Sequence, residues 1–273
     1  MPYLKLKDAE IYYETHGSGP PFLFCSVTGL DHQAWKFHQV AEFSRDHKVI
    51  IFDYRGTGKS SKTIEKYSIK MFTEDAAALL DHLDAAQAIV CGHSMGGVVA
   101  QLLSLDYPHR VKTLILASSG SAHPGAHGIP LAMCRDMVRK GFEGYIREHT
   151  VETGWTTEFV KSNPALIEEF LRVRLSGIAP LENYLHFVWA RQEHDHTHRL
   201  NEIHAPTLVL VGDDERHGAA DRSHWDAAHH LAKEIHNAKL VVLKGEGHHY
   251  LATNPAAAHK AMRAIINGCS DGA

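Results

Sequence analysis

A serine stands between two glycines at residues 92–96, in the order G-H-S-M-G. An apolar run at 88–91 precedes this pentapeptide, and a run with helical character follows it at 98–108. A sharp turn from a strand into a helix strains the serine backbone and exposes its Oγ above the edge of the sheet. The start of the helix also offers unpaired N–H groups to a developing anion. Ser94 is therefore a candidate nucleophile for attack on a carbonyl carbon.

Four segments in chain order resemble motifs of the α/β-hydrolase superfamily, and the resemblance covers nearly the whole chain. They are D-Y-R-G-T-G-K-S at 53–60, G-H-S-M-G-G at 92–97, P-T-L-V-L-V-G at 206–212 and G-E-G-H-H at 245–249. The resemblance implies the α/β-hydrolase fold, a mostly parallel eight-stranded sheet flanked by helices, with a helical cap inserted after the sixth strand. It also implies a hydrolase with a Ser-His-Asp/Glu triad, esterase-like or lactonase-like.

A serine hydroxyl is a weak nucleophile and needs a base within hydrogen-bond reach, oriented by a third group. The resemblance implies the chain order serine, acid, histidine, and its G-x-G-H pattern selects His248 as the base rather than the adjacent His249. The family's acid usually lies three positions after the glycine that ends its strand. Counted from Gly212, that position is Glu215, whereas Asp214 is favoured by residue type. The sequence leaves open which of the two orients the imidazole.

Most members of the superfamily carry His-Gly-X after the third strand, but this chain has Ser26-Val27-Thr28 there. Backbone donors do not depend on the side chain, so the N–H groups of Thr28 and Met95 are the predicted oxyanion hole. The segment C-S-V-T-G-L-D-H-Q-A-W at 25–35 is similar to a stretch of 3-oxoadipate enol-lactonases. The R-G-T-G-K-S run with its following Y-S-I is similar to aminoacrylate hydrolases, and neither similarity fixes the substrate.

The predicted strands and helices that must position these residues alternate along the chain. Apolar runs predict strands at 20–25, 48–54, 88–91, 111–118, 206–212 and 239–243, after a hairpin at the start of the chain. Helical spacing predicts helices at 34–46, 68–84, 98–108 and 223–236, and from about 255. Such alternation is typical of a mostly parallel sheet covered on both faces.

The alternation pauses in the middle of the chain, where helical segments dominate. We therefore expect a core formed by 1–120 and 204–273, with a helical cap at 121–203. The cap should form the roof of a pocket, and the predicted substrate contacts are Val27, His93, Trp155 and Trp189. Arginines of the cap are either solvated or available to a substrate carboxylate, and these are Arg135, Arg139 and Arg191. The histidines between His194 and His198 predict a solvated surface rather than a metal site.

Composition limits the other functions. The chain has 273 residues, 44% hydrophobic and 22% charged, with a net charge of -4. This charge makes nucleic acid and anionic membranes poor partners. The four cysteines match no metal or redox spacing, and no run is long enough to span a bilayer. We expect a cytoplasmic protein without cofactor or metal that acts on a small ester or lactone, and a homodimer is compatible with the sequence.

The preferred hypothesis is a serine hydrolase that cleaves an ester or lactone bond, including an enol-lactone or amide, through an acyl-enzyme. Three alternatives stay open on the same scaffold. One is a carbon–carbon bond hydrolase, although such enzymes commonly have Asn where this chain has His93. The others are a ligand receptor and a cofactor-independent oxygenase that uses His248 as a base without acylating Ser94.

Overall fold

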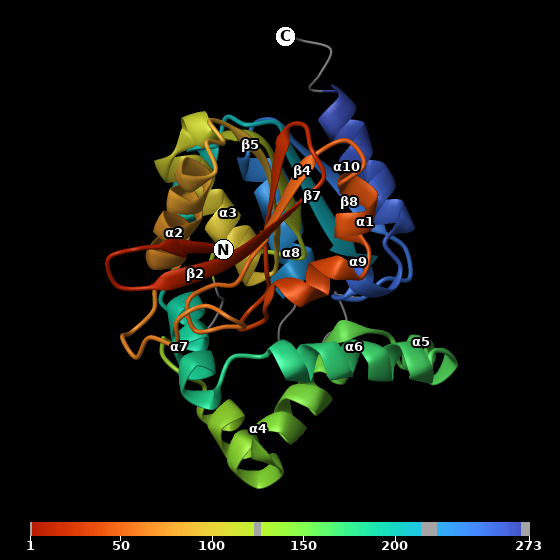
Figure 1. Ribbon diagram of the computed structural model, residues 1–273. Helices are drawn as coiled ribbons and strands as arrows, with labels where there is room; N and C mark the ends of the chain where they lie inside the picture. Colours follow the sequence, from red (N-terminus) through yellow and green to blue (C-terminus); the bar gives the residue numbers. More distant parts are fainter. Residues whose placement is uncertain (1, 123–126, 214–222, 269–273) are drawn as a thin grey trace.

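The computed structural model describes residues 2–122, 127–213 and 223–268. An eight-stranded sheet passes through the centre of the molecule, in the order β1-β2-β4-β3-β5-β6-β7-β8 (Figure 1). Strand β2 pairs antiparallel with β1 and β4, and the other neighbours are parallel. The strands are β1 Tyr3–Lys5, β2 Glu10–His16, β3 Pro21–Cys25, β4 Lys48–Phe52, β5 Ala88–His93, β6 Val111–Ala117, β7 Thr207–Gly212 and β8 Ala238–Leu243.

The central strands are continuous apolar runs because both faces of the sheet are covered. Every residue of β5 and β7 is buried, as are the last four of β3 and β4. The edge strand β8 is only partly buried along most of its length. The predicted α/β-hydrolase fold is confirmed.

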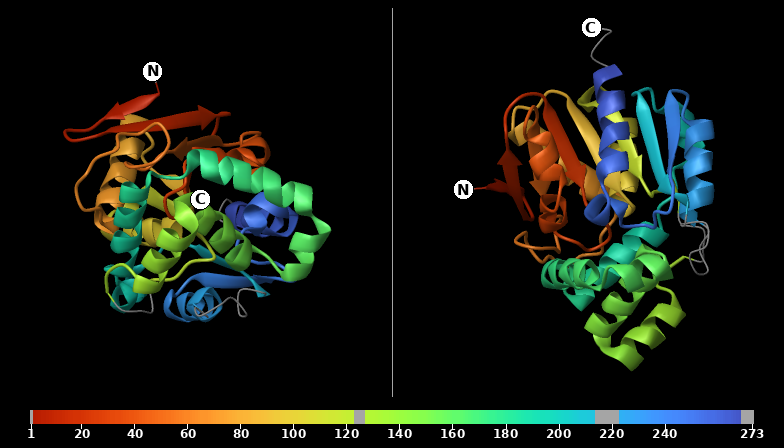
Figure 2. Two further views of the ribbon diagram at one scale, coloured as in Figure 1. Left: turned by 90° about the horizontal axis from the view of Figure 1, so that it is seen from below. Right: turned by 90° about the vertical axis from the view of Figure 1, so that its right-hand side faces the viewer.

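Two layers of helices cover the sheet (Figures 1 and 2). Helices α2 (Ile69–His82), α3 (Met95–Asp106) and α8 (Ser223–Glu234) share one hydrophobic cluster. Helices α1 (Gln39–Phe43) and α10 (Ala256–Gly268) pack in a second cluster on the opposite face. The side chain of Ser68 begins α2 by accepting the N–H of Met71 at 3.1 Å. The short helices η2 (Pro108–Arg110) and α9 (Tyr250–Thr253) complete the core.

The helix predicted at 34–46 is wrong as a single element. The chain forms the 3-10 helix η1 (His32–Lys36) and then α1, separated at His38, which has φ -146° and ψ -40°. His38 Nε2 is paired with Ala252 O at 3.1 Å, and Gln39 Nε2 donates to Leu251 O at 2.6 Å. These contacts with the segment after β8 accompany the break in the helix. The spacing of apolar residues along the chain gives no information about such long-range contacts.

The cap lies between β6 and β7, over the ends of the parallel strands (Figure 1). Its helices are α4 (Leu131–Gly154, with a kink at Gly141), α5 (Thr157–Ser162), α6 (Pro164–Gly177) and α7 (Leu181–Gln192), followed by η3 (Thr197–Glu202). A bridge between Leu30 and Ile178 joins it to the loop after β3. The insertion after the sixth strand is confirmed, whereas the division at 121 and 203 stays a prediction. Within the described ranges no helix is long and apolar enough to cross a membrane.

Candidate active site

Ser94 occupies the junction between β5 and α3 in a strained backbone conformation, with φ 55° and ψ -121°. Two glycines make this turn sterically possible. A Cβ on Gly92 would lie 2.1 Å from Gly96 O, and a Cβ on Gly96 would lie 2.0 Å from Cys25 O. Ser119 Oγ donates to Ser94 O at 2.8 Å and helps to hold the turn. Strain of this kind persists only where surrounding contacts impose it, and it is typical of functional sites.

His248 lies in the loop after β8, against the residue that precedes the predicted nucleophile. His93 Nε2 donates to His248 O at 2.8 Å, and the two ring centroids are 4.9 Å apart. The ring of His224, at the start of α8, lies 4.4 Å from that of His248. The fold thus brings the predicted base to the turn that carries Ser94, although 153 positions separate them in the sequence.

Both candidate acids, Asp214 and Glu215, lie outside the described residues, so the choice between them stays a prediction. The preceding residues are informative about where the chain leaves β7. Asp213 Oδ1 accepts the N–H of Gly245 at 2.6 Å. A Cβ on Gly212 would lie 2.1 Å from Glu246 O. The end of β7 therefore touches the loop that carries His248.

The loop after β3 packs closely on the start of α3, because a Cβ on Gly96 would lie 2.6 Å from Ser26 O. Thr28 and Met95, the predicted oxyanion donors, are both buried in this region. Trp35 Nε1 donates to Ser26 Oγ at 2.8 Å and fixes the beginning of the loop. The hydroxyl of Thr28 is buried and has no hydrogen-bond partner in the described part of the chain. The roles of Thr28 and Met95 stay predictions.

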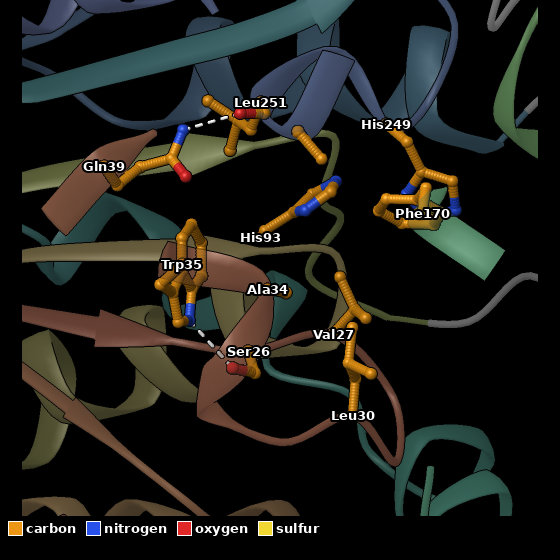
Figure 3. Close-up of a pocket in the computed structure, with 11 residues that line it drawn as sticks. Ser26, Val27, Leu30, Ala34, Trp35, Gln39, His93, Phe170, His249 and Leu251 are labelled. Carbon is orange, nitrogen blue, oxygen red and sulfur yellow. Dashed lines mark hydrogen bonds between the residues drawn. The ribbon is translucent and has the colours of Figure 1, made fainter. Parts of the chain in front are cut away.

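A pocket lies between the core and α6, with about 350 Å³ of empty space that includes some open solvent (Figure 3). Val27 and His93, both predicted substrate contacts, line it. Its other walls come from the loop after β3, from η1 and α1, from α6 and from the segment after β8. They are Ser26, Leu30, Ala34, Trp35, Gln39, Phe170, His249, Leu251 and Ala252.

His249 is a pocket residue that the motif comparison passed over in favour of His248. It is 4% exposed, and its ring centroid lies 4.8 Å from Phe170 and 5.1 Å from Trp155. Gly154 permits this approach, because a Cβ there would lie 2.6 Å from His249 Cδ2. Burial, together with the nearby charges of His248 and Arg174, lowers the pKa of His249 well below its ordinary value. The doubled histidine of the G-E-G-H-H motif was the available signal.

The two predicted tryptophan contacts are separated by the fold. Trp155 contacts His249 and donates from Nε1 to Thr253 Oγ1 at 3.1 Å. Trp189 lies instead in a different groove, where Lys66 Nζ is 3.6 Å from its ring centroid. The structure therefore places Trp155, and not Trp189, beside the pocket at His93.

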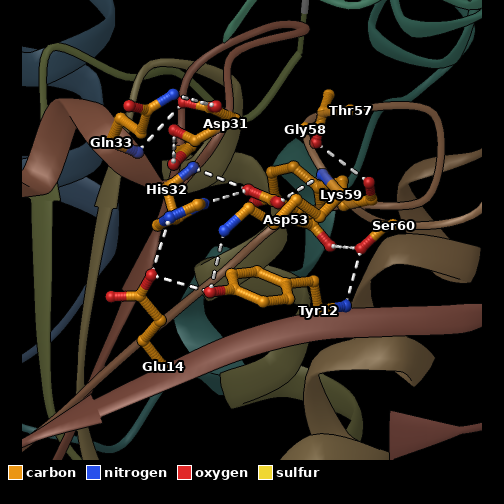
Figure 4. A network of polar contacts seen from close by, with 12 residues as sticks. Tyr12, Glu14, Asp31, His32, Gln33, Asp53, Thr57, Gly58, Lys59 and Ser60 are labelled. Atoms are coloured by element: carbon orange, nitrogen blue, oxygen red, sulfur yellow. Dashed lines mark hydrogen bonds and ion pairs between the residues drawn. The ribbon is translucent and has the colours of Figure 1, made fainter. Parts of the chain in front are cut away.

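Two clusters of described residues have the composition of a metal site. His93, His248 and His249 each offer one ligand atom, and these atoms lie within 4.8 Å of one another. Asp31, His32 and Asp53 form the second cluster, in a polar network that also includes Glu14 and Tyr12 (Figure 4). Imidazole groups suit zinc, copper or nickel. A metal on the first cluster would occupy the predicted base, so it would compete with proton transfer.

The prediction of a solvated surface for the histidines between His194 and His198 is wrong for two of them. His196 is buried, and its Nε2 is paired with Gln101 Oε1 at 2.9 Å. Its Nδ1 is paired with His194, which is partly buried. Burial lowers the pKa of His196 to about 3 and that of His194 to about 4. Of the three histidines in this segment only His198 is exposed; His196 contacts α3 through Gln101, and His194 contacts His196.

The chain is similar to known proteins in both sequence and structure. Residues 20–255 match the family model described as alpha/beta hydrolase fold. A protein named "Putative carbamate hydrolase RutD" from Azorhizobium caulinodans is 28% identical over 93% of this chain and 94% of its own length. The 3-oxoadipate enol-lactonase 2 of Acinetobacter baylyi is 32% identical over 77% of each chain. The enol-lactonase structure from Burkholderia xenovorans has a TM-score of 0.84 at 24% identity, covering 97% of this chain and all of that one.

Proposed function

The chain belongs to the alpha/beta hydrolase fold family, and on this basis we propose that it is a serine hydrolase that cleaves an ester or lactone bond of a small molecule. Ser94 is the nucleophile, His248 the general base, and the reaction passes through an acyl-enzyme. The names of the relatives, an enol-lactonase and a carbamate hydrolase, agree with attack on an activated carbonyl.

One observation carries the proposal. Ser94 has a positive φ. The glycines two positions before and after it lie so close to backbone atoms that neither position has room for a side chain. A serine that only capped a helix would need neither the strain nor the two close approaches. The hydrogen bond from His93 to the carbonyl of His248 brings the histidine loop to the same turn.

The chemistry begins when His248 takes the proton of Ser94 Oγ while Oγ attacks the carbonyl carbon. The N–H groups of Met95 and Thr28 bind the oxyanion of the tetrahedral intermediate. Asp214 or Glu215 orients the imidazole and stabilises its charged form. His248 then returns the proton to the leaving alcohol or enol oxygen, and the acyl group stays on Ser94.

Deacylation repeats these steps with water as the nucleophile. His248 removes a proton from the water, the hydroxide attacks the acyl carbonyl, and Ser94 recovers its proton as the acid leaves. In these two half-reactions every proton and leaving group is accounted for without a cofactor or a metal. A small-molecule substrate is the only partner that it requires.

A fluorophosphonate probe tests the nucleophile directly. We expect one stoichiometric adduct on Ser94, located by intact mass and peptide mapping. The variants Ser94→Ala and His248→Ala should lose the adduct, and their hydrolysis of a para-nitrophenyl ester should fall by about 10⁴-fold or more.

Two surface variants serve as matched controls, because Ser176 and His109 are exposed and lie outside the site. Ser176→Ala and His109→Ala should label and turn over like the wild-type chain. An unlabelled Ser94 in a protein that also leaves simple esters untouched would remove the nucleophile and, with it, the acyl-enzyme.

A further inference from the structure

Arg174 is a buried cation for which the described residues supply too few hydrogen-bond partners. It lies near the end of α6 and is 6% exposed. Its Nε and Nη1 atoms are buried and have no hydrogen-bond partner within residues 2–122, 127–213 and 223–268. The titratable groups that act on it are the phenols of Tyr184 and Tyr145, and among the described residues it forms no ion pair with a carboxylate.

The surroundings of Arg174 place it on the pocket side of the cap. Phe170, one helical turn earlier on the same face of α6, packs against His249 and lines the pocket (Figure 3). The charge of Arg174 also acts on His249. Tyr184 in turn packs on Gly29, where a Cβ would lie 2.7 Å from its ring. The guanidinium therefore lies near groups that reach both the histidine loop and the predicted oxyanion loop.

Other unpartnered polar atoms occur among these elements. Arg191 Nε on α7 is buried without a hydrogen bond, and its charge, like that of Arg174, acts on Tyr145. Thr28 Oγ1 is also buried without a partner, one residue from the Gly29 contact. By contrast, Arg135 and Arg139 are exposed, so the fold does not bring these two predicted carboxylate ligands to the pocket.

A buried guanidinium without a counter-ion is unfavourable, because its desolvation is not offset. Burial lowers the pKa of Arg174, but an arginine does not lose its proton in a protein, so it cannot become neutral as a lysine or histidine does. A ligand that supplied the missing partner would offset this cost. The guanidinium fork fits a carboxylate with two parallel hydrogen bonds.

We propose that Arg174 binds a carboxylate of the substrate, and that the natural substrates of this chain are therefore anionic esters or lactones that carry a free carboxylate besides the bond that is cleaved. The inference rests on the proposed function, since it assigns the substrate class of the same site. Arg174 acts in recognition, whereas Ser94 and His248 carry out the chemistry.

The test compares matched charged and neutral esters. The charged probes are the para-nitrophenyl half-esters of glutarate and adipate, and in the neutral probes an isopropyl group replaces the carboxylate. We expect kcat/KM to favour the charged member of each pair, after subtraction of the uncatalysed rate. Arg174→Met should lower kcat/KM for the charged esters by about 10²-fold and leave the neutral esters within about threefold.

The matched control is Arg172→Met, because Arg172 is an exposed arginine on the same helix. It should retain the charge preference of the wild-type chain. Arg174→Lys keeps the charge but not the fork, so it should recover only part of the preference.

A binding measurement covers the case in which Arg174→Met folds poorly. In the Ser94→Ala background, glutarate and adipate should raise the melting temperature, whereas the corresponding neutral diols should not. Substitution of Arg174 should abolish this shift, and substitution of Arg172 should not.

The outcomes separate the two proposals. Labelled Ser94 with equal kcat/KM for charged and neutral esters, or a charge preference that survives Arg174→Met, would overturn the assignment of Arg174 alone. Failure of Ser94 to react with the fluorophosphonate would overturn the serine hydrolase instead, even if dicarboxylates bind through Arg174.

Discussion

Asp53 and Arg174 are both buried ionisable residues, but their surroundings differ completely. Asp53 is 0% exposed and accepts three hydrogen bonds, from His32 N at 2.8 Å, His32 Nδ1 at 2.7 Å and Lys59 N at 2.8 Å (Figure 4). The other ring nitrogen of His32 lies 3.1 Å from Glu14 Oε1. Arg174 is almost as deeply buried, and two of its nitrogen atoms find no partner among the residues that the structure describes.

The difference indicates different roles for the two residues: the Asp53 carboxylate stabilises the fold, whereas the Arg174 guanidinium is proposed to bind a ligand. The network around Asp53 connects β2, the loop after β4 and the start of η1, which follows the loop that carries Thr28. Its polar groups have partners, so it can stabilise that loop without a ligand. A buried guanidinium with unpartnered nitrogen atoms is expected to lower the stability of the free protein, and a ligand that pairs with it would offset the desolvation.

Removing Asp53 should have the largest effect. In Asp53→Ala the N–H groups of His32 and Lys59 lose their acceptor, and His32 loses one of its two carboxylates. We expect the free energy of unfolding, measured by urea denaturation, to fall by about 3–5 kcal/mol. Glu169→Ala, at an exposed carboxylate, should change it by less than about 0.5 kcal/mol. A loss under about 1 kcal/mol for Asp53→Ala would mean that the network is not structural.

Crowding Asp53 should have the next largest effect. Gly58 has φ +45°, and a Cβ there would lie 2.2 Å from Asp53 Oδ2. Gly58→Ala should therefore combine backbone strain with displacement of the carboxylate and cost about 2–3 kcal/mol of unfolding free energy. Gly141 also has a positive φ but nothing within 4 Å of its Cβ position. Gly141 has φ 74° and ψ 162°, so Gly141→Ala should show backbone strain of about 1–3 kcal/mol without a clash. A Gly58→Ala variant that loses no more stability than Gly141→Ala would contradict the steric argument.

Replacing Arg174 should act in the opposite direction. Arg174→Met removes an unpartnered buried charge, so the free energy of unfolding should rise by about 1–2 kcal/mol. Urea denaturation measures both Arg174→Met and the exposed control Arg172→Met. The control should differ from the wild-type chain by less than about 0.5 kcal/mol, so the comparison isolates the effect of burial. A destabilised Arg174→Met variant would show that the guanidinium stabilises the free fold.

Protonation of Glu14 at low pH should have the smallest of these effects on the free energy of unfolding, because it weakens only one edge of the Asp53 network. Burial tends to raise the pKa of Glu14, but hydrogen bonds from Lys36, Tyr12 and His16 outweigh it and lower the pKa from 4.5 to about 2. Because the folded-state pKa is depressed, this stabilisation is present above pH 4.5 and is lost as the pH falls towards 2. We expect a loss of about 1 kcal/mol from this residue.

Urea denaturation at several pH values between 5 and 2 measures this contribution. Glu14→Gln should be less stable than the wild-type chain at pH 5, and the gap should narrow as the pH falls. A gap that stays constant over this range would show that ionised Glu14 does not contribute through its charge.

Much of the fold could be predicted from the sequence because the signals are local. The apolar runs that became β3 to β7 are mostly buried strands, and the run that became β8 is a partly buried edge strand. The glycines around Ser94 are required by a turn formed within five residues. The helix at 34–46 failed as a prediction because contacts of His38 and Gln39 with the segment after β8 accompany its break. Spacing along the chain does not encode such contacts.

The sequence by itself determined the strand order along the chain, the strained serine and the histidine loop, since each depends on residues adjacent in the chain. Only the tertiary structure decided that His249 lies between Trp155 and Phe170, that Trp189 lies in another groove, and that Arg174 is buried without a partner. Burial and pairing depend on which distant elements pack around a side chain. A sequence motif can therefore nominate a nucleophile, whereas a buried charge without a partner becomes visible only when the cap and core are seen together.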